Sequence, residues 1–212
     1  MKFSTENNIT NQQDSSFKLL SSRDKILAVV KQNQPANTSL PVIINHDQHY
    51  PDVVRKFSEV LGFIGGAVIL VNDFEQVINI IKGNFADAKR IVSTCEELSS
   101  IAEVNTPVDD PHDLANVDLF ITTSNLAVAE NGAVWITDNQ LPARALPFIA
   151  QQIAVIIKKE NVVATMHDAY DVIADTDYGY AAFIAGPSKT ADIEQSLVLG
   201  AHGPKTMTVF II

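Results

Sequence analysis

The segment GPSKTADIE at residues 186–194 carries the strongest local signal for chemistry in this sequence. It follows an apolar run, and its Gly-Pro break makes Ser188 a predicted helix N-cap, with Lys189 adding a positive charge. The backbone N–H groups in the first turn of a helix form an anion site. We therefore predict that a small anion binds at this strand-to-helix turn. The alternative from the residues alone is an ordinary capping box without a ligand.

A second candidate is the AENGA turn at residues 129–133. Asn131 and Gly132 permit a turn with positive φ, which would hold the carboxylate of Glu130 at the edge of a strand. A carboxylate in that place could act as a base, a nucleophile or a ligand. A hairpin turn with a solvated glutamate is the alternative.

Three further segments contain residues that suit a binding site. Arg144 lies among apolar residues between two prolines, where it could hold an anion or end a helix. His202, in GAHGP at residues 200–204, is expected on a loop, where it binds an anion or is structural. His46 and His49 are spaced like metal ligands, but no third ligand is evident, so we predict no metal site.

Composition excludes several classes of function. The formal net charge is −10, and no cluster of Lys or Arg is present that could follow a phosphate backbone, so a nucleic-acid partner is not expected. The lone Cys95 rules out an intramolecular disulfide, and by itself it cannot hold an iron–sulfur cluster or structural zinc. We expect Cys95 to pack rather than react. Since no apolar run is long enough to span a membrane and no secretory signal is evident, we expect a cytoplasmic protein.

Hydrophobic patterns predict the elements that position these residues. Residues 1–16 are polar and are expected to form a loose arm, whereas residues 17–30 carry a helical stripe with a cap at Ser21 or Ser22. The remaining predictions in the first half are strands at 41–45, 67–71 and from residue 90, with helices over 53–61 and 74–81.

The second half predicts further strands at 119–122, 133–137 and 153–157 and a helix over 162–173. The first two of these strands are joined by too short a segment for a crossover helix, which suggests a helical turn or hairpin-like pairing. The last stretch is read as a strand at 180–185, a helix over 190–199 and a strand at 207–212, which together form one βαβ unit. In such a unit His202 would lie at the edge opposite the Gly186 turn.

The continuous runs of Val and Ile predict an α/β fold: an open, mostly parallel sheet with helices on both faces. No linker-like composition interrupts residues 41–212. We therefore expect one domain over residues 17–212. The sequence contains no GxGxxG, GxSxG or Walker motif.

The GPSKTADIE and GAHGP segments with the terminal strand resemble the C-terminal signature of the lactate-utilization protein C family, also called the LUD domain. The resemblance is strongest over residues 117–212, with Lys189 where Arg is usual and Asn131 where Thr is usual. The matching positions are Glu130, Gly186, Ser188, Lys189, Thr190, Asp192, Glu194 and His202.

The resemblance implies a fold similar to the ribose-phosphate isomerase, glucosamine-phosphate deaminase and CoA-transferase group, a modified Rossmann architecture. It also implies participation in the oxidation of L-lactate to pyruvate with two iron–sulfur partner proteins, which would hold the clusters, so that this chain needs no cofactor. The matching positions from Gly186 to His202, together with Arg144, are the expected ligand-binding residues. Glu130 is a catalytic candidate.

Two alternatives remain at this point. Glu130-Asn131-Gly132 is similar to the Glu-Asn-Gly turn of CoA-transferase β-halves, which would make Glu130 the nucleophile of an acyl-transfer enzyme. The other alternative is a protein-interaction module whose ligand site has decayed.

Overall fold

A computed structural model of the chain describes residues 21–39, 50–105, 108–191 and 197–212. Its contacts divide the chain into two units, Met1–His46 and Asp47–Ile212. The first unit contains helix α1 (Ser22–Gln32), whose N-terminus is capped by Ser21, as predicted; Ser21 also forms a capping box with Asp24. The strand predicted at residues 41–45 lies outside the described residues, and the single domain predicted from residue 17 stays a prediction.

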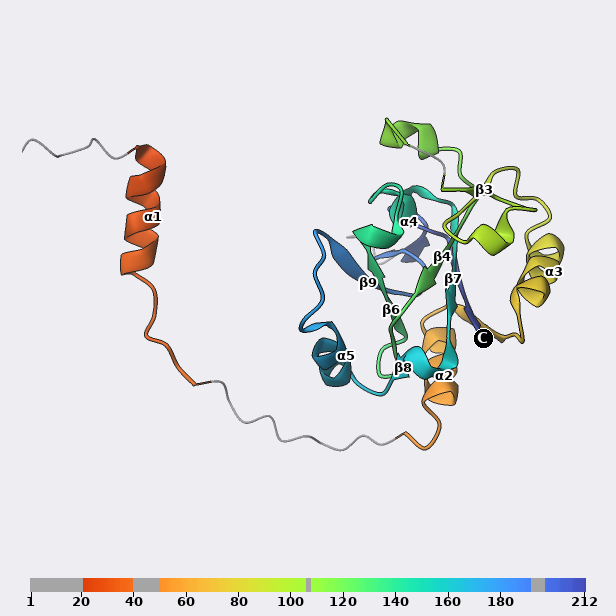
Figure 1. Ribbon diagram of the computed structural model, residues 1–212, viewed down its shortest axis with the longest axis horizontal. Coiled ribbons are helices and arrows are strands. Elements are labelled where there is room, and N and C mark those ends of the chain that lie inside the picture. Colours follow the sequence, from red (N-terminus) through yellow and green to blue (C-terminus); the bar gives the residue numbers. More distant parts are fainter. Residues whose placement is uncertain (1–20, 40–49, 106–107, 192–196) are drawn as a thin grey trace, which may run out of the picture. The chain divides into compact units, whose positions relative to one another are not determined.

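The second unit is built on a six-stranded sheet in which every neighbouring pair of strands is parallel (Figure 1). The strand order is β1-β12-β7-β4-β2-β3. The bounds are β1 (Ala67–Leu70), β2 (Ile91–Ser93), β3 (Glu103–Val104), β4 (Leu119–Ser124), β7 (Gln152–Ile157) and β12 (Thr206–Ile211). The predicted open, mostly parallel sheet is confirmed.

The alternation of side chains along the central strands assigns each face of this sheet to a different core. Leu119 and Ile121 pack on one face with helix α3 (Phe74–Asn84) and the 3₁₀ helix η1 (Glu96–Leu98). Phe120 points to the other face, where helix α2 (Val53–Phe63) packs. Both faces of β4 and β7 are therefore buried, which is why these strands are continuously apolar. The helices predicted over 53–61 and 74–81 are confirmed, and so is the placement of helices on both faces.

A second sheet, which the sequence patterns did not predict, shares the core on the α2 side. Its order is β8-β5-β6-β9, with bounds β5 (Ala127–Val128), β6 (Ala133–Thr137), β8 (Val162–Val163) and β9 (Ala181–Ala185). Helix α5 (Met166–Ile173) covers its outer face. The predicted strands 119–122 and 133–137 thus lie in different sheets, and the hairpin is formed by β5 and β6.

Three predictions about the second half differ from the structure. The helix expected over 162–173 starts only at Met166, because Val162 and Val163 pair with β5 and Thr165 forms the capping box with Asp168. The helix expected over 190–199 is replaced, at its described positions, by an antiparallel pair, β10 (Lys189–Ala191) and β11 (Leu197–Leu199). Since β9 and β12 belong to different sheets, the predicted βαβ unit does not exist.

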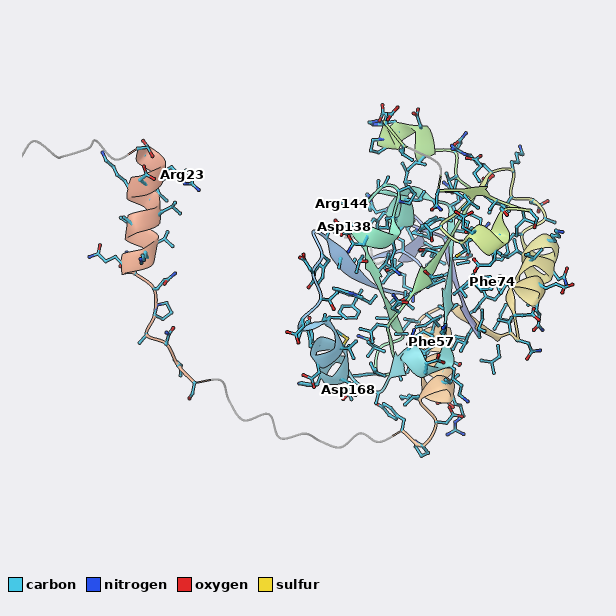
Figure 2. All side chains as sticks on the ribbon, in the orientation of Figure 1. Arg23, Phe57, Phe74, Asp138, Arg144 and Asp168 are labelled. Atoms are coloured by element: carbon cyan, nitrogen blue, oxygen red, sulfur yellow. The ribbon has the colours of Figure 1, made fainter. Side chains whose placement is uncertain are left out.

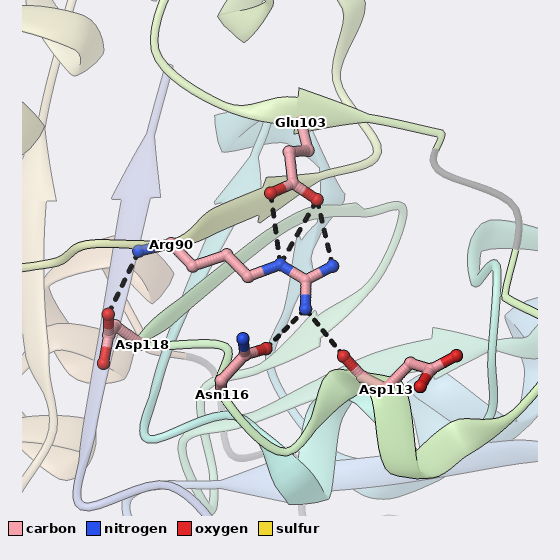
Figure 3. Close-up of polar contacts among 5 residues, drawn as sticks. All are labelled: Arg90, Glu103, Asp113, Asn116 and Asp118. Atoms are coloured by element: carbon pink, nitrogen blue, oxygen red, sulfur yellow. Dashed lines mark hydrogen bonds and ion pairs between the residues drawn. The ribbon is translucent and has the colours of Figure 1, made fainter.

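Arg90 holds the amino-terminal edge of the large sheet together (Figure 3). Its guanidinium makes a two-nitrogen contact with Glu103, at the start of β3, and donates to the carbonyl oxygen of Asp113 and to the side chain of Asn116. Its backbone N–H donates to Asp118, just before β4.

Among the described residues, no helix has the length and hydrophobicity that crossing a bilayer requires.

Candidate functional site

The two glycine turns predicted from the sequence meet at the C-terminal end of α2. Gly132 and Gly186 have φ angles of +70° and +73°. A Cβ atom on Gly186 would lie 3.1 Å from Ile64 Cγ1, and one on Gly132 would lie 3.1 Å from the backbone of Leu61. Both positions therefore need glycine for backbone conformation and for close packing.

The Gly186 turn also contacts the loop at residues 200–204. The backbone N–H of Ser188 donates to the carbonyl oxygen of Pro204 at 2.8 Å, and that of Gly200 donates to the carbonyl oxygen of Ser188 at 3.0 Å. The expectation that these two segments lie at opposite edges was wrong, because it assumed a helix between them. The Ser188 N–H is thus hydrogen-bonded within the protein, and the described residues after it form strand β10 in place of the helical turn whose free N–H groups were predicted to hold an anion.

Lys189 points to α2 and not to an open anion site. Its ammonium group donates to the carbonyl oxygen of Ile64, just past the last residue of α2. A cation there satisfies a terminal carbonyl and favours the helix dipole. Thr190 is half-buried in β10, and His202 is exposed on its loop.

Asp192 and Glu194 lie outside the described residues. The roles predicted for the residues from 186 to 202 therefore stay predictions. The helix N-terminus on which these predictions were based is not formed by the described residues, which pair as β10 and β11.

The carboxylate of Glu130 lies at the N-terminus of α5. It is exposed, and its Oε2 atom accepts a hydrogen bond of 2.8 Å from the backbone N–H of Met166, the first residue of that helix. The backbone N–H of Glu130 donates to the carbonyl oxygen of Ala164. The turn thus presents a solvent-accessible carboxylate that is held in place by one backbone donor.

Arg144 forms an ion pair with Asp138, the first residue of the 3₁₀ helix η3 (Asp138–Gln140) (Figure 2). The distance from Arg144 Nη2 to Asp138 Oδ2 is 2.6 Å, and the guanidinium lies over the ring of Tyr180. Desolvation opposes ionisation of Asp138, but hydrogen bonds from the Tyr180 backbone and from Arg144 outweigh it and lower the pKa of Asp138 below its ordinary value. Arg144 therefore fixes the loop over residues 138–144.

That loop forms one wall of a polar cleft of about 450 Å³. The cleft lies where β2, β3 and β4 end: Thr94 follows β2, Asn105 follows β3 with a φ of +49°, and Thr123 is the second-last residue of β4. The other lining residues are Asn139, Gln140, Leu141 and Pro142. In open parallel sheets, ligands bind beyond the carboxyl ends of the strands, and this cleft is in that position.

The connections of the neighbouring strands diverge at the cleft. From β2 the chain continues to β3 on one side, whereas from β4 it passes through the second sheet and returns as β7 on the other side. Such a reversal of direction is where α/β sheets open a crevice. These residues were not among those predicted from the sequence motifs. The available signal was a polar residue directly after an apolar strand, Thr94 after 91–93 and Thr123 after 119–122.

Residues 109–212 match the family model described as the LUD domain. A lactate utilization protein C from Anoxybacillus flavithermus is 34% identical over 96 residues, which cover 45% of this chain and 44% of that protein. One from Shouchella clausii is 38% identical over 92 residues, 41% of this chain and 40% of that protein. Residues 109–212 of this chain belong to the LUD domain family. The match confirms the resemblance that the GPSKTADIE and GAHGP segments indicated.

In these matches the chain spans less than half the length of its curated relatives. A crystal structure of a DUF162 family protein from Deinococcus radiodurans superimposes with a TM-score of 0.60 at 16% identity, covering 75% of this chain and 95% of that one. This similarity concerns the fold, which is α/β in both.

The cleft combines LUD-domain residues with residues that precede the domain. Thr123, Asn139 and Gln140 lie inside the matched segment, whereas Thr94 and Asn105 lie before it. Within the part of the chain that the structure describes, no three His, Cys, Asp or Glu side chains come together to hold a metal ion. The side chains that line the cleft offer hydroxyl and amide groups, which suit hydrogen bonding to a ligand.

Cys95 is next to the cleft in sequence but is buried in the core on the α3 side. Burial raises the pKa of its thiol, and hydrogen bonds with Ser93 and Thr94 lower it. The effect of burial is larger, so the pKa lies above its ordinary value. A thiol with a raised pKa is a poor nucleophile at neutral pH.

Proposed function

We propose that this protein is a lactate-utilization protein C-like subunit that takes part in the oxidation of L-lactate to pyruvate with two iron–sulfur partner proteins. The observation that carries the proposal is the LUD-domain match over residues 109–212, together with relatives named lactate utilization protein C. The relatives' name supports a role in lactate utilization, and the LUD domain links this chain to them. The oxidation step and the two partner proteins are what the family resemblance implies.

The chemistry of the chain supports a division of labour with such partners. Oxidation of lactate to pyruvate releases two electrons and two protons, so a redox group must accept the electrons. The one cysteine of this chain is buried, and a cluster needs several thiolate ligands. The electron acceptors in our proposal are therefore the clusters of the partner proteins.

The small-molecule site of this proposal is the cleft at the ends of β2 and β4. The Gly186 turn is a weaker choice, because the Ser188 amide and the Lys189 ammonium group already have backbone partners. The cleft, in contrast, has a volume of about 450 Å³ and is lined by hydroxyl and amide groups. Arg144 lies in the loop that forms the wall of the cleft, and because it pairs with Asp138, its role in this proposal is to position that loop.

The acyl-transfer alternative is supported by the exposure of the Glu130 carboxylate in its glycine-containing turn. As a nucleophile, Glu130 would have to give up its hydrogen bond with Met166. Incubation with acyl-CoA and trapping by hydroxylamine tests this function. A modified peptide containing Glu130 would favour it over the lactate-utilization role, and an unmodified peptide would count against it.

The main test is genetic and biochemical. Deletion of the gene should abolish growth on L-lactate but not on glucose, and the full-length gene should restore it. The tagged protein should co-purify with two iron–sulfur proteins from lactate-grown cells. Normal growth of the deletion strain on L-lactate, with no such proteins in the eluate, would refute the proposal.

A further inference from the structure

Strand β4 continues past the end of its neighbour β2, and this mismatch creates the floor of the cleft. The pairing of β2 ends at Ser93, opposite Ile121, and Thr94 still donates its N–H to the Ile121 carbonyl. Residues 122–124 go on pairing with β7. On the β2 side, the carbonyl oxygen of Thr123 accepts instead from the side chain of Gln140 at 3.3 Å. A strand edge is thus exposed to the cleft and is bonded by side chains, not by another strand.

The lining of the cleft is polar and carries no formal charge. It contains two hydroxyl groups and three primary amides, besides Leu141 and Pro142; the polar residues are Thr94, Asn105, Thr123, Asn139 and Gln140. Hydroxyl and amide groups both donate and accept hydrogen bonds. They match a ligand rich in hydroxyl and carbonyl oxygens. A polyphosphate, which needs several cations, does not match them.

The amide side chains are already oriented by protein contacts. Asn105 Nδ2 donates to Glu96 at 2.7 Å, and Asn139 Nδ2 donates to the carbonyl oxygen of Asp177 at 3.4 Å. Thr94 Oγ1 lies 2.9 Å from Thr122 Oγ1. Asn105 and Asn139 each use one amide hydrogen in these contacts, so the other hydrogen and the oxygen can serve a ligand. Gln140 is more fully engaged, because its oxygen accepts from Thr137 and its Nε2 donates to Thr123. Side chains that are held in this way recognise a ligand with less loss of entropy.

We infer that the cleft binds a small, oxygen-rich molecule with at most one negative charge. The class that we assign is a 2-hydroxy or 2-oxo monocarboxylate, an assignment that rests on the proposed function. A neutral sugar offers the same hydroxyl and carbonyl groups and is the other source of this chemistry. The net charge of −10 for the chain disfavours polyanions in either case.

The test is calorimetric titration of the full-length chain with four separate probes: L-lactate, pyruvate, D-ribose and inorganic phosphate. Thr123→Val and Asn139→Ala remove hydrogen-bonding groups from the cleft. Thr206→Val is the matched control, because Thr206 lies at the amino-terminal edge of the same sheet, where its hydroxyl donates to Gln152. Circular dichroism checks that each variant is folded.

We expect L-lactate or pyruvate to bind and each cleft variant to weaken the affinity by about five- to tenfold, as loss of one hydrogen bond does. The control should bind like the wild type. Binding of D-ribose alone, with the same sensitivity, would keep the cleft as the site but contradict the hydroxy-acid class.

Two results would overturn the inference: no binding of any oxygen-rich probe, or equal affinity in the wild type and both cleft variants. Phosphate binding alone would also overturn it. These failures differ from that of the proposed function, which is judged by the growth of the deletion strain on L-lactate. Equal affinity of the wild type and both cleft variants for L-lactate, beside a deletion strain that does not grow on L-lactate, would reject the cleft and keep the proposed function.

Discussion

The carboxylate of Glu130 accepts a hydrogen bond of 2.8 Å from the backbone N–H of Met166, the residue that opens helix α5. The side-chain hydroxyl of Thr165 caps the same helix by accepting a hydrogen bond from the backbone N–H of Asp168. Two acceptors from different parts of the chain therefore satisfy N–H groups at one helix terminus. This joins the β5–β6 turn to α5, so the side chain that the sequence offers for catalysis also has a structural contact.

Replacing Glu130 by Ala should lower the free energy of unfolding by about 1 kcal/mol, since a charged acceptor at a helix N-terminus is lost. Glu130→Gln keeps an acceptor oxygen and should lose less than half of that. Urea unfolding followed by circular dichroism measures both. Glu160→Ala, at an exposed glutamate in the 3₁₀ helix η4 (Lys159–Asn161), is the control and should be neutral. Equal stability of all three variants would show that the Met166 contact contributes nothing.

Gly186→Ala should destabilise the protein by about 2 kcal/mol, because alanine disfavours the φ of +73° and its Cβ would crowd Ile64. Gly62→Ala is the matched control: it lies in α2, and a Cβ there would meet no atom within 4 Å. That change should stabilise the protein by about 0.5–1 kcal/mol. Thermal or urea unfolding of the pair gives the comparison. A similar loss in both variants would contradict the packing at Ile64.

Arg90→Lys should cost about 1–2 kcal/mol, since lysine cannot reproduce the planar contacts with Glu103, Asp113 and Asn116. Only 22% of the Arg90 side chain is exposed, so water cannot replace all of these bonds. Arg55→Lys changes an arginine in an exposed ion pair with Glu59 and should stay within about 0.5 kcal/mol of the wild type. Denaturant midpoints of the two variants and the wild type measure both losses. An equally small loss in Arg90→Lys and Arg55→Lys would contradict the prediction.

The sequence predicts the elements whose signals are local. The runs at 119–122 and 153–157 are apolar because both faces of β4 and β7 are buried, and the stripe at 74–81 belongs to a helix with one buried side. In each case the hydrophobic pattern of the segment itself indicates both the type of element and the face that is buried. These predictions are confirmed by the structure.

Predictions failed where a distant partner decides the conformation. Ser188 has the local pattern of an N-cap, but its N–H bonds to Pro204 and its carbonyl accepts from Gly200, which places the following residues in an antiparallel pair. The cleft was missed for a similar reason: Thr94 and Thr123 become neighbours only because β2 stops opposite Ile121. Neither the register nor the length of a partner strand can be inferred from one segment.

Cys95 should react with a thiol reagent only when the protein unfolds. The side chain is 3% exposed, and burial raises the pKa of the thiol, so both access and thiolate are lacking at pH 7. Since the chain has a single cysteine, the reaction reports one site. Its rate should rise with urea in step with the unfolding curve. Fast labelling of the native protein would disprove the buried position.

Acid should weaken the loop over residues 138–144 through Asp138. The folded pKa of this carboxyl group is lower than its unfolded pKa, so the ionised form stabilises the fold. That contribution is present above the unfolded pKa, about 4, and is lost as the pH falls through the folded pKa. Asp138→Asn cannot ionise, so the difference in unfolding midpoint between wild type and variant should be largest at pH 6–7 and shrink towards pH 3. Asp171→Asn, at an exposed position of α5, provides the comparison. A wild-type advantage over Asp138→Asn that stays constant from pH 7 to pH 3 would contradict the stabilising role of the ionised Asp138–Arg144 pair.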